Sequence, residues 1–288
     1  MASSSIEWTE ATWNPVTGCT RASAGCDLCY AVTMTRRLAA MGSEKYAGLI
    51  NAGKHHFNGV VRTHADTLDQ PLRRRQDTLW FVNSMSDLFH PGVPFEFVAA
   101  VFGVMAATPQ HQYQVLTKRP ERMRAYFDWL AEQEPGPVAL CTKAAATAMG
   151  RALRVDQKRW PLPNVWLGTS VEDERVANRI AALRSVPAQV RFLSCEPLIG
   201  SLDLDGRLDG IHWVIVGGES GAGARPMKPE WAASIQAACR AQGVAYFFKQ
   251  TGAVLAREWG LDSKKGSDAD EWPVPFQHLG ERAFPVTA

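Results

Sequence analysis

Short apolar runs alternate with longer amphipathic segments along most of the chain. The run at residues 79–82, Leu-Trp-Phe-Val, is apolar at every position, as expected of a parallel strand that is covered on both faces. The segment at residues 95–107 suits a helix, and Pro94 stands at its start, where proline is favoured. This repeated strand-then-helix pattern predicts an α/β architecture with a parallel sheet.

The pattern places about eight strands along the chain. That number favours a (β/α) TIM-type barrel, complete or irregular, formed by residues 1–288 as a single domain. An open doubly wound sheet is the alternative. Residues 131–163 depart from the rhythm and are interpreted as an insertion, and residues 251–288 as an irregular C-terminal extension. We expect strands at 5–16, 59–64, 79–84, 113–117, 164–170, 190–194, 211–216 and 244–248, and helices at 31–41, 68–75, 95–107, 120–130, 172–184 and 229–241.

Polar residues and glycines directly follow most of the predicted strands. In a barrel of parallel strands these positions gather at the C-terminal rim, where active sites lie. They therefore predict one shared site, although strand ends also turn polar wherever they reach water. The residues concerned are Ser84, Ser86, Asp87, Lys118, Ser170, Glu172, Ser194, Glu196, Gly217, Gly218, Glu219 and Lys249.

Three of the six cysteines lie in one loop after the first predicted strand. Cys19, Cys26 and Cys29 are spaced C-x6-C-x2-C. In a reducing compartment, clustered cysteines are more often metal ligands or redox groups than disulfides. A structural zinc needs a fourth ligand, for which His55, His56 and His64 are candidates. An iron–sulfur cluster with one open coordination position is the favoured interpretation.

Composition sets outer limits on the function. The hydrophobic content of 46% and charged content of 21% are those of a globular protein. A net charge of +2 is too small for the overall field to drive strong nucleic-acid binding, although basic residues cluster locally at Arg36-Arg37 and around Arg151 to Arg159. The first ten residues lack the basic flank and apolar core of a signal peptide, and no apolar run approaches the roughly 20 residues of a membrane span. We therefore expect a cytoplasmic protein with no membrane partner.

The cysteine segment resembles a known family. Residues Ile6-Glu7-Trp8-Thr9 and Trp13 to Cys19, with Cys26, Cys29 and Tyr30, are similar to a phage and bacterial three-Cys-motif family of uncertain function that is described as radical-SAM-like. Segments 81–89, 116–120, 194–197 and 217–221 extend the resemblance over most of the chain. The usual spacing in radical S-adenosylmethionine (SAM) enzymes is C-x3-C-x2-C, so the gap between Cys19 and Cys26 is a departure.

The resemblance implies a cofactor and a reaction. Cys19, Cys26 and Cys29 would each bind one iron of a [4Fe–4S] cluster whose fourth iron binds SAM. Reductive cleavage of SAM, with an electron from a separate donor, would give a 5′-deoxyadenosyl radical that abstracts hydrogen from an unknown substrate, with nucleotides and nucleic acids as candidates. By position, the residues expected to contact SAM are Tyr30, Ser84, Ser86, Asp87, Lys118, Ser170, Glu172, Ser194, Glu196, Gly217, Gly218 and Glu219.

Cys195 and Glu196 are the candidate catalytic residues, and two other functions compete with the radical SAM interpretation. Cys195, beside Glu196, is a candidate hydrogen-atom donor to a substrate radical, but a single cysteine is usually a small buried apolar residue. One competing function is a non-enzymatic zinc or iron–sulfur module that binds nucleic acid or a protein. The other is a barrel hydrolase that uses Glu196 and Glu219 as acid and base.

Overall fold

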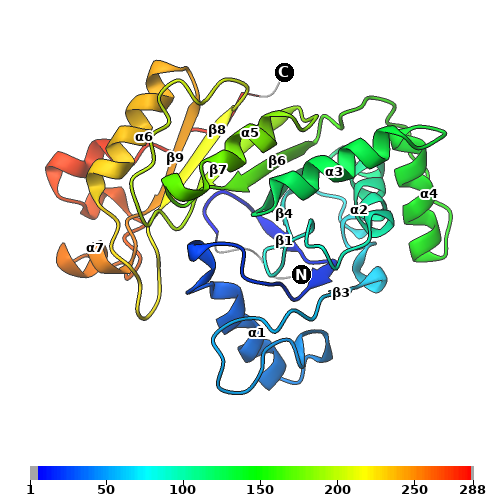
Figure 1. The fold of residues 1–288 in the computed structure, drawn as a ribbon, viewed down its shortest axis with the longest axis horizontal. Coiled ribbons are helices and arrows are strands. Elements are labelled where there is room, and N and C mark those ends of the chain that lie inside the picture. Colours follow the sequence, from blue (N-terminus) through cyan, green and yellow to red (C-terminus); the bar gives the residue numbers. More distant parts are fainter. Residues whose placement is uncertain (1–5, 287–288) are drawn as a thin grey trace. The chain divides into compact units, whose positions relative to one another are not determined.

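The computed structural model describes residues 6–286, in which seven strands form one sheet (Figure 1). The order in the sheet, β1-β4-β5-β6-β7-β8-β9, follows the chain without reversing. The pairs β1–β4, β4–β5, β7–β8 and β8–β9 are parallel. The strands are β1 (Ala11–Trp13), β4 (Leu79–Val82), β5 (Gln112–Thr117), β6 (Val165–Ser170), β7 (Val190–Cys195), β8 (Trp213–Gly217) and β9 (Ala245–Gln250).

The strand order decides between the two predicted sheet types. A doubly wound sheet reverses direction at a switch point, and this sheet does not. The order is therefore the one that a (β/α) barrel requires. In residues 6–286, however, β1 and β9 are the edges of the sheet, so the sheet is open and the expectation of a complete barrel is wrong.

Most of the helices follow the strands as predicted. Those at 95–107 and 229–241 have the expected bounds, and the one expected at 31–41 begins one residue earlier. No helix in the described part of the chain is long and apolar enough to cross a membrane. The α-helices are α1 (Tyr30–Ala40), α2 (Phe95–Ala107), α3 (Pro120–Ala131), α4 (Pro137–Met149), α5 (Asn178–Arg184), α6 (Pro229–Ala241) and α7 (Ala253–Glu258).

Three predicted elements differ from the structure. The strand expected at 59–64 is not in the main sheet, because its apolar run is only Val60-Val61, and Arg62–Thr63 instead form β3, antiparallel to β2 (Val16–Thr17). The helix expected at 68–75 is reduced to a 3₁₀ turn at Pro71–Arg73, since proline has no N–H to continue a helix. The helix expected at 172–184 begins only at Asn178, after a 3₁₀ turn.

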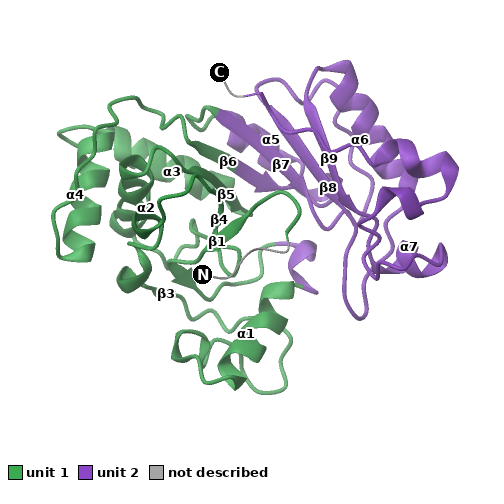
Figure 2. Cartoon of the chain, turned by 180° about the vertical axis from the view of Figure 1, so that it is seen from behind, with its two compact units in different colours: residues 1–22, 29–167, 185–189 green, residues 23–28, 168–184, 190–288 purple. Residues whose placement is uncertain are grey.

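The chain folds into two compact units (Figure 2). Unit 1 is residues 1–22, 29–167 and 185–189, and unit 2 is residues 23–28, 168–184 and 190–288. The structure does not describe residues 1–5 and 287–288, which include the first residue of the strand predicted at 5–16. The single domain predicted for residues 1–288 stays a prediction. The segment expected as an insertion contains α4, and the C-terminal extension contains α7 and two 3₁₀ helices.

Each unit has its own aromatic core. In unit 1, Tyr126 is fully buried, with its ring centroid 5.4 Å from that of Phe102 and 5.9 Å from that of Phe89. In unit 2, Trp213 lies 5.7 Å from Phe192 and 5.9 Å from Phe247.

Helix α4 packs against α2 at a glycine. A Cβ atom on Gly103 would lie 2.0 Å from the carbonyl oxygen of Cys141, a distance that backbone cannot tolerate. Glycine therefore allows the two helices to approach closely despite its low helix propensity. Thus the 131–163 segment is fixed to unit 1 by its helix.

We predict that Gly103→Ala lowers the free energy of unfolding by about 1–3 kcal/mol because the added methyl group forces α4 away from α2. The substitution raises helix propensity by about 1 kcal/mol, so a loss of stability can only come from packing. Urea unfolding measures the effect, with Lys143→Ala on the exposed side of α4 as the control. A Gly103→Ala chain as stable as the wild type would contradict the close packing.

Candidate metal centre

The three clustered cysteines lie between β2 and α1. Cys26 is the last residue of a 3₁₀ turn, Ala24–Cys26, and Cys29 immediately precedes α1. All three are half-buried. The loop starts at Gly18, whose φ is +83° and whose Cβ would lie 1.9 Å from the carbonyl oxygen of Val60. Only glycine allows the chain to enter the loop along this path.

A buried ion pair in unit 1 holds the start of the loop. Arg119 Nη1 lies 2.7 Å from Asp87 Oδ2, and Arg119 Nη2 donates to the Thr20 carbonyl oxygen at 2.9 Å. The Cys19 Sγ atom lies 3.9 Å from Arg119 Nη1. Burial opposes the charge of Arg119, but Asp87 and the Cys19 sulfur outweigh it, so the pKa of the guanidinium is raised. The pair therefore places a permanent cation beside the first thiol.

A neutral histidine completes this anchor. His90 Nδ1 accepts a hydrogen bond from the Gly92 amide at 3.0 Å, so the ring proton is on Nε2, which lies 2.9 Å from Thr20 Oγ1. Burial and the nearby Arg119 lower the pKa of His90. Thr20 thus receives hydrogen bonds from two side chains outside the loop, His90 and Arg119.

The predicted rim residues of unit 1 mostly bind the chain itself. Ser86 Oγ donates to the Val16 carbonyl oxygen at 2.8 Å, and the Tyr30 hydroxyl donates to the Ser84 carbonyl oxygen. Asp87 also accepts from Thr117 Oγ1 at 2.7 Å and from the Lys118 amide at 3.2 Å. These contacts bring Ser84, Ser86 and Asp87 together around the segment that precedes the cysteines.

A second anchor, in unit 2, holds the turn that carries Cys26. Ser23 Oγ donates to Glu172 Oε1 at 2.7 Å, and Arg179 Nη1 donates to Glu172 Oε2 at 3.0 Å. A Cβ atom on Gly25 would lie 2.4 Å from Glu172 Oε1. Glu172 is therefore enclosed by the turn and by Arg179, and its side chain is only 1% exposed.

Arg225 ties the same turn to Glu219. Its Nε and Nη2 atoms donate to the two carboxylate oxygens of Glu219 at 2.8 and 2.5 Å, and its Nη1 atom donates to the Ala24 carbonyl oxygen at 3.0 Å. The hydrogen bonds to Glu219 raise the pKa of Arg225. Glu219 is thus the partner of an arginine that sequence reasoning did not single out.

The remaining predicted residues of unit 2 are also engaged. Lys249 Nζ lies 2.9 Å from Glu196 Oε1, and Ser194 Oγ lies 3.5 Å from Glu196 Oε2. A Cβ atom on Gly217 would lie 2.8 Å from Glu196 Oε1, and one on Gly218 would lie 2.1 Å from the Thr251 carbonyl oxygen. Both glycines are therefore required by the packing of the chain on itself. The Ser170 carbonyl oxygen accepts from Arg179 at 2.9 Å.

The other three cysteines are buried. Burial raises the pKa of Cys195 well above its usual range, and it raises the pKa of Cys141 and of Cys239 to about 12. Cys195 is 0% exposed. This is the environment of a small apolar residue and not of a reactive thiol.

The donor set of the loop fits a metal that prefers sulfur. Three half-buried cysteines within one loop are the ligand type of iron–sulfur clusters and of structural zinc. Across residues 6–286, no group of three or more His, Cys, Asp or Glu side chains is placed to hold a metal ion. Of the histidines suggested for zinc, His64 Nε2 is 2.8 Å from Thr17 Oγ1, and His55 and His56 are exposed.

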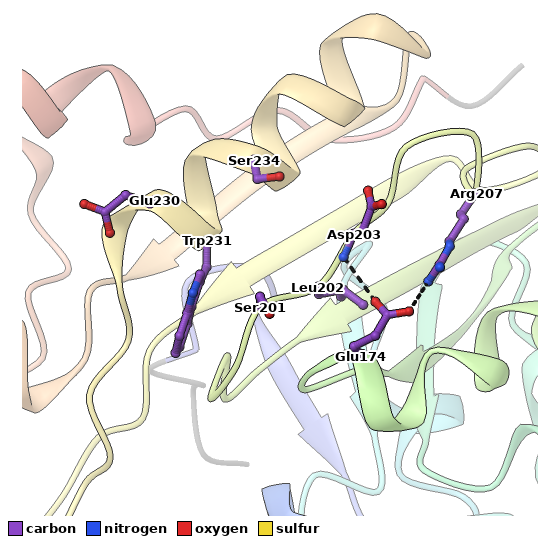
Figure 3. A pocket seen from close by; sticks show the side chains of 8 residues that line it. All are labelled: Glu174, Ser201, Leu202, Asp203, Arg207, Glu230, Trp231 and Ser234. Carbon is purple, nitrogen blue, oxygen red and sulfur yellow. Dashed lines mark hydrogen bonds and ion pairs between the residues drawn. The ribbon is translucent and has the colours of Figure 1, made fainter.

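Unit 2 also has a surface pocket of about 330 Å³ that includes no predicted site residue (Figure 3). Glu174 borders it, paired with Arg207 at 2.6 Å and bonded to the Asp203 amide at 3.2 Å. The remaining residues that line it are Ser201, Leu202, Glu230, Trp231 and Ser234.

These features define an α/β protein with an open seven-stranded sheet and a three-cysteine loop held by arginine–carboxylate pairs. Residues 3–273 match a family described as "Protein of unknown function (DUF5131)", and the chain belongs to this family. A search of curated proteins finds no match.

The solved structures that are similar include spore photoproduct lyases. A cysteine-to-serine variant matches 83% of this chain and 63% of its own, at 15% identity and a TM-score of 0.42. A variant with bound AdoMet and dinucleoside spore photoproduct matches 93% of this chain and 66% of its own, at 13% identity and a TM-score of 0.40. The chain thus spans less than two thirds of these lyase chains, and likenesses this distant assign no function.

We predict two classes of thiol in the apo protein. Cys19, Cys26 and Cys29 should react with a chromogenic disulfide at neutral pH, because they are half-buried. Cys141, Cys195 and Cys239 should react only after unfolding, because burial keeps them protonated. Thiol titration with and without denaturant counts both classes, and more than three fast thiols would contradict the assignment.

We predict that Arg225→Ala loosens the turn that carries Cys26 and leaves Cys19 unaffected. The loss of the bond to Ala24 and of the partly exposed pair with Glu219 should cost about 1–2 kcal/mol. Alkylation of each cysteine, read by peptide mass spectrometry, should show a faster Cys26. Arg225→Lys should fall between, and Arg175→Ala, an exposed arginine of the same unit, is the control. Equal rates at Cys26 in all four proteins would refute the anchor.

Proposed function

We propose that the chain is an iron–sulfur enzyme of the radical SAM type, in which Cys19, Cys26 and Cys29 hold a [4Fe–4S] cluster that binds SAM. One observation carries the proposal: three half-buried cysteines lie in a single loop whose two parts are each held by a buried carboxylate and its arginine. When bound, the cluster and SAM supply a 5′-deoxyadenosyl radical by one-electron reductive cleavage. The chain then has to hold the thiols, shield the centre and orient its substrate.

The anchors suit the requirements of such a centre. Metal ligands are thiolates, and the Arg119 guanidinium 3.9 Å from the Cys19 sulfur favours the anionic form. The loop has little regular structure of its own, so its order depends on Asp87, Arg119 and Thr20 at one part and on Glu172, Glu219 and Arg225 at the other. We assign Asp87, Glu172 and Glu219 to positioning the cysteines.

The contacts to SAM are part of the same proposal. Tyr30 directly follows Cys29 and is 53% exposed, so it can contact a ligand of the cluster. Ser84, Ser86, Lys118, Ser170, Ser194, Glu196, Gly217 and Gly218 are the other proposed contacts. Cys195 is not proposed as a hydrogen-atom donor, because it is fully buried. Nucleotides and nucleic acids are the proposed substrate class, and the proposed location is the cytoplasm.

We predict that anaerobic reconstitution with iron and sulfide gives about four iron and four sulfide per chain, with a visible charge-transfer absorption. Cys19→Ser, Cys26→Ser and Cys29→Ser should each lose most of the cluster because each removes one ligand. Cys239→Ala, at a buried thiol outside the loop, is the matched control. Iron, zinc and sulfide are measured on the same samples. Stoichiometric zinc without sulfide would replace the enzyme by a zinc-binding module.

A further inference from the structure

Two basic segments that are far apart in the sequence meet on the surface of unit 1 (Figure 2). The Asp69 carboxylate lies between them: Arg73 Nη2 is 2.5 Å from Asp69 Oδ2, and Arg151 Nη2 is 4.0 Å from the same oxygen atom. The side chains of Arg73 and Arg151 are 67% and 54% exposed, so one carboxylate holds two guanidinium groups together in solvent. We call the cations of the two segments the basic patch. They are Arg73, Arg74, Arg75, Arg151, Arg154, Lys158 and Arg159.

The fold holds the backbone on both sides of this contact. Arg73 ends a 3₁₀ turn that begins at Pro71, and the Pro71 carbonyl oxygen lies 3.0 Å from Nε2 of the buried His111. On the other side, Gly150 ends α4 in the left-handed conformation, with a φ of +64°, and Arg151 follows it directly. Both arginines therefore extend from ordered backbone, which reduces the entropy that a bound ligand has to offset.

The positive charge of the chain is concentrated in these two segments. Residues 69–77 contain three arginines and two aspartates, and residues 151–159 contain four Lys or Arg residues and one aspartate, for a net charge of +4. The whole chain has +2, so the rest of it is negative. Among the ion pairs of residues 6–286, none involves Arg75, Lys158 or Arg159. These cations are therefore available to an anionic partner.

We propose that the basic patch binds the phosphate backbone of a nucleic-acid strand. The inference rests on the proposed function, because it assigns a surface of unit 1 to holding the nucleic-acid substrate. Arginine presents a planar fork of N–H donors that matches a phosphate group in geometry. Arg73 and Arg151 have exposed donors beyond those directed at Asp69, and the neighbouring cations extend the charge along both segments. Binding forms ion pairs with the phosphates and releases their counterions.

The composition of the patch favours a nucleic acid over a protein or a membrane as its partner. Protein interfaces have a core that is depleted of charge and rich in aromatic residues and methionine, and helices that lie on membranes present apolar side chains to the lipid. Within the described chain, the large hydrophobic side chains that are exposed all lie outside residues 69–77 and 151–159. Nucleic-acid interfaces are more polar and much more strongly positive than protein interfaces, and the patch has this character.

The test measures binding of the full apo chain to fluorescent single-stranded DNA and RNA of one sequence, by anisotropy over a range of salt concentrations. The logarithm of the affinity should fall linearly with the logarithm of the salt concentration, and Arg73→Ala/Arg151→Ala should make this slope shallower by about 1–2. Arg73→Lys/Arg151→Lys should keep the slope because it keeps both charges. Arg184→Ala/Arg240→Ala removes two exposed, carboxylate-paired arginines of unit 2, and this matched control should bind as the wild type does.

The outcomes separate this inference from the proposed function. No binding of either oligonucleotide at low salt, a slope that Arg73→Ala/Arg151→Ala leaves unchanged, or an equal effect of the control variant would each overturn the inference. Patch-dependent binding of phosphatidylserine vesicles in place of the oligonucleotides would overturn it as well. Oligonucleotide binding through the patch by a chain that forms no cluster on reconstitution would support the inference and count against the proposed function alone. A cluster that responds to SAM in a chain that binds no oligonucleotide would do the reverse.

Discussion

The cysteine loop depends on carboxylate–arginine pairs more than on any regular structure. A loop that folds into one conformation loses conformational entropy at every residue, and this loop contains only a single 3₁₀ turn to offset the loss. The pair of Asp87 with Arg119 and the pair of Glu219 with Arg225 each supply hydrogen bonds to loop carbonyl groups, at Thr20 and Ala24. Breaking the pair of Asp87 with Arg119 leaves a buried charge without a partner, which is far more costly than losing one hydrogen bond.

These pairs give the polar residues at the strand ends a structural role. As a set, they predict a site, because the ends of parallel strands share one edge of a sheet. In the structure, Asp87 follows β4 and binds Arg119 after β5, and Glu219 follows β8 and binds Arg225. Their first role is therefore to hold one another and the cysteine loop. The glycines after β8 likewise make room for Glu196 and the Thr251 carbonyl group.

The pattern of apolar and polar residues predicted most of the individual strands and helices. It did not predict which side chains, distant in the sequence, contact one another. The apolar run of β4 and the proline-led helix α2 were predictable because their signals lie within one segment. The prediction of a main-sheet strand at 59–64 was wrong, because two valines are as compatible with a short antiparallel strand pair as with a core strand. Arg225 was missed because it stands in an irregular segment 201 residues from Ala24, its loop partner, and periodicity carries no information across that distance.

The central claim is that the three cysteines hold a cluster that binds SAM at an open position. The most direct measurement is the electron paramagnetic resonance spectrum of the reduced, reconstituted protein with and without SAM. Direct binding of SAM to the cluster predicts a changed spectrum, and the change should not occur with S-adenosylhomocysteine at the same concentration. A spectrum that SAM leaves unaltered would contradict the claim.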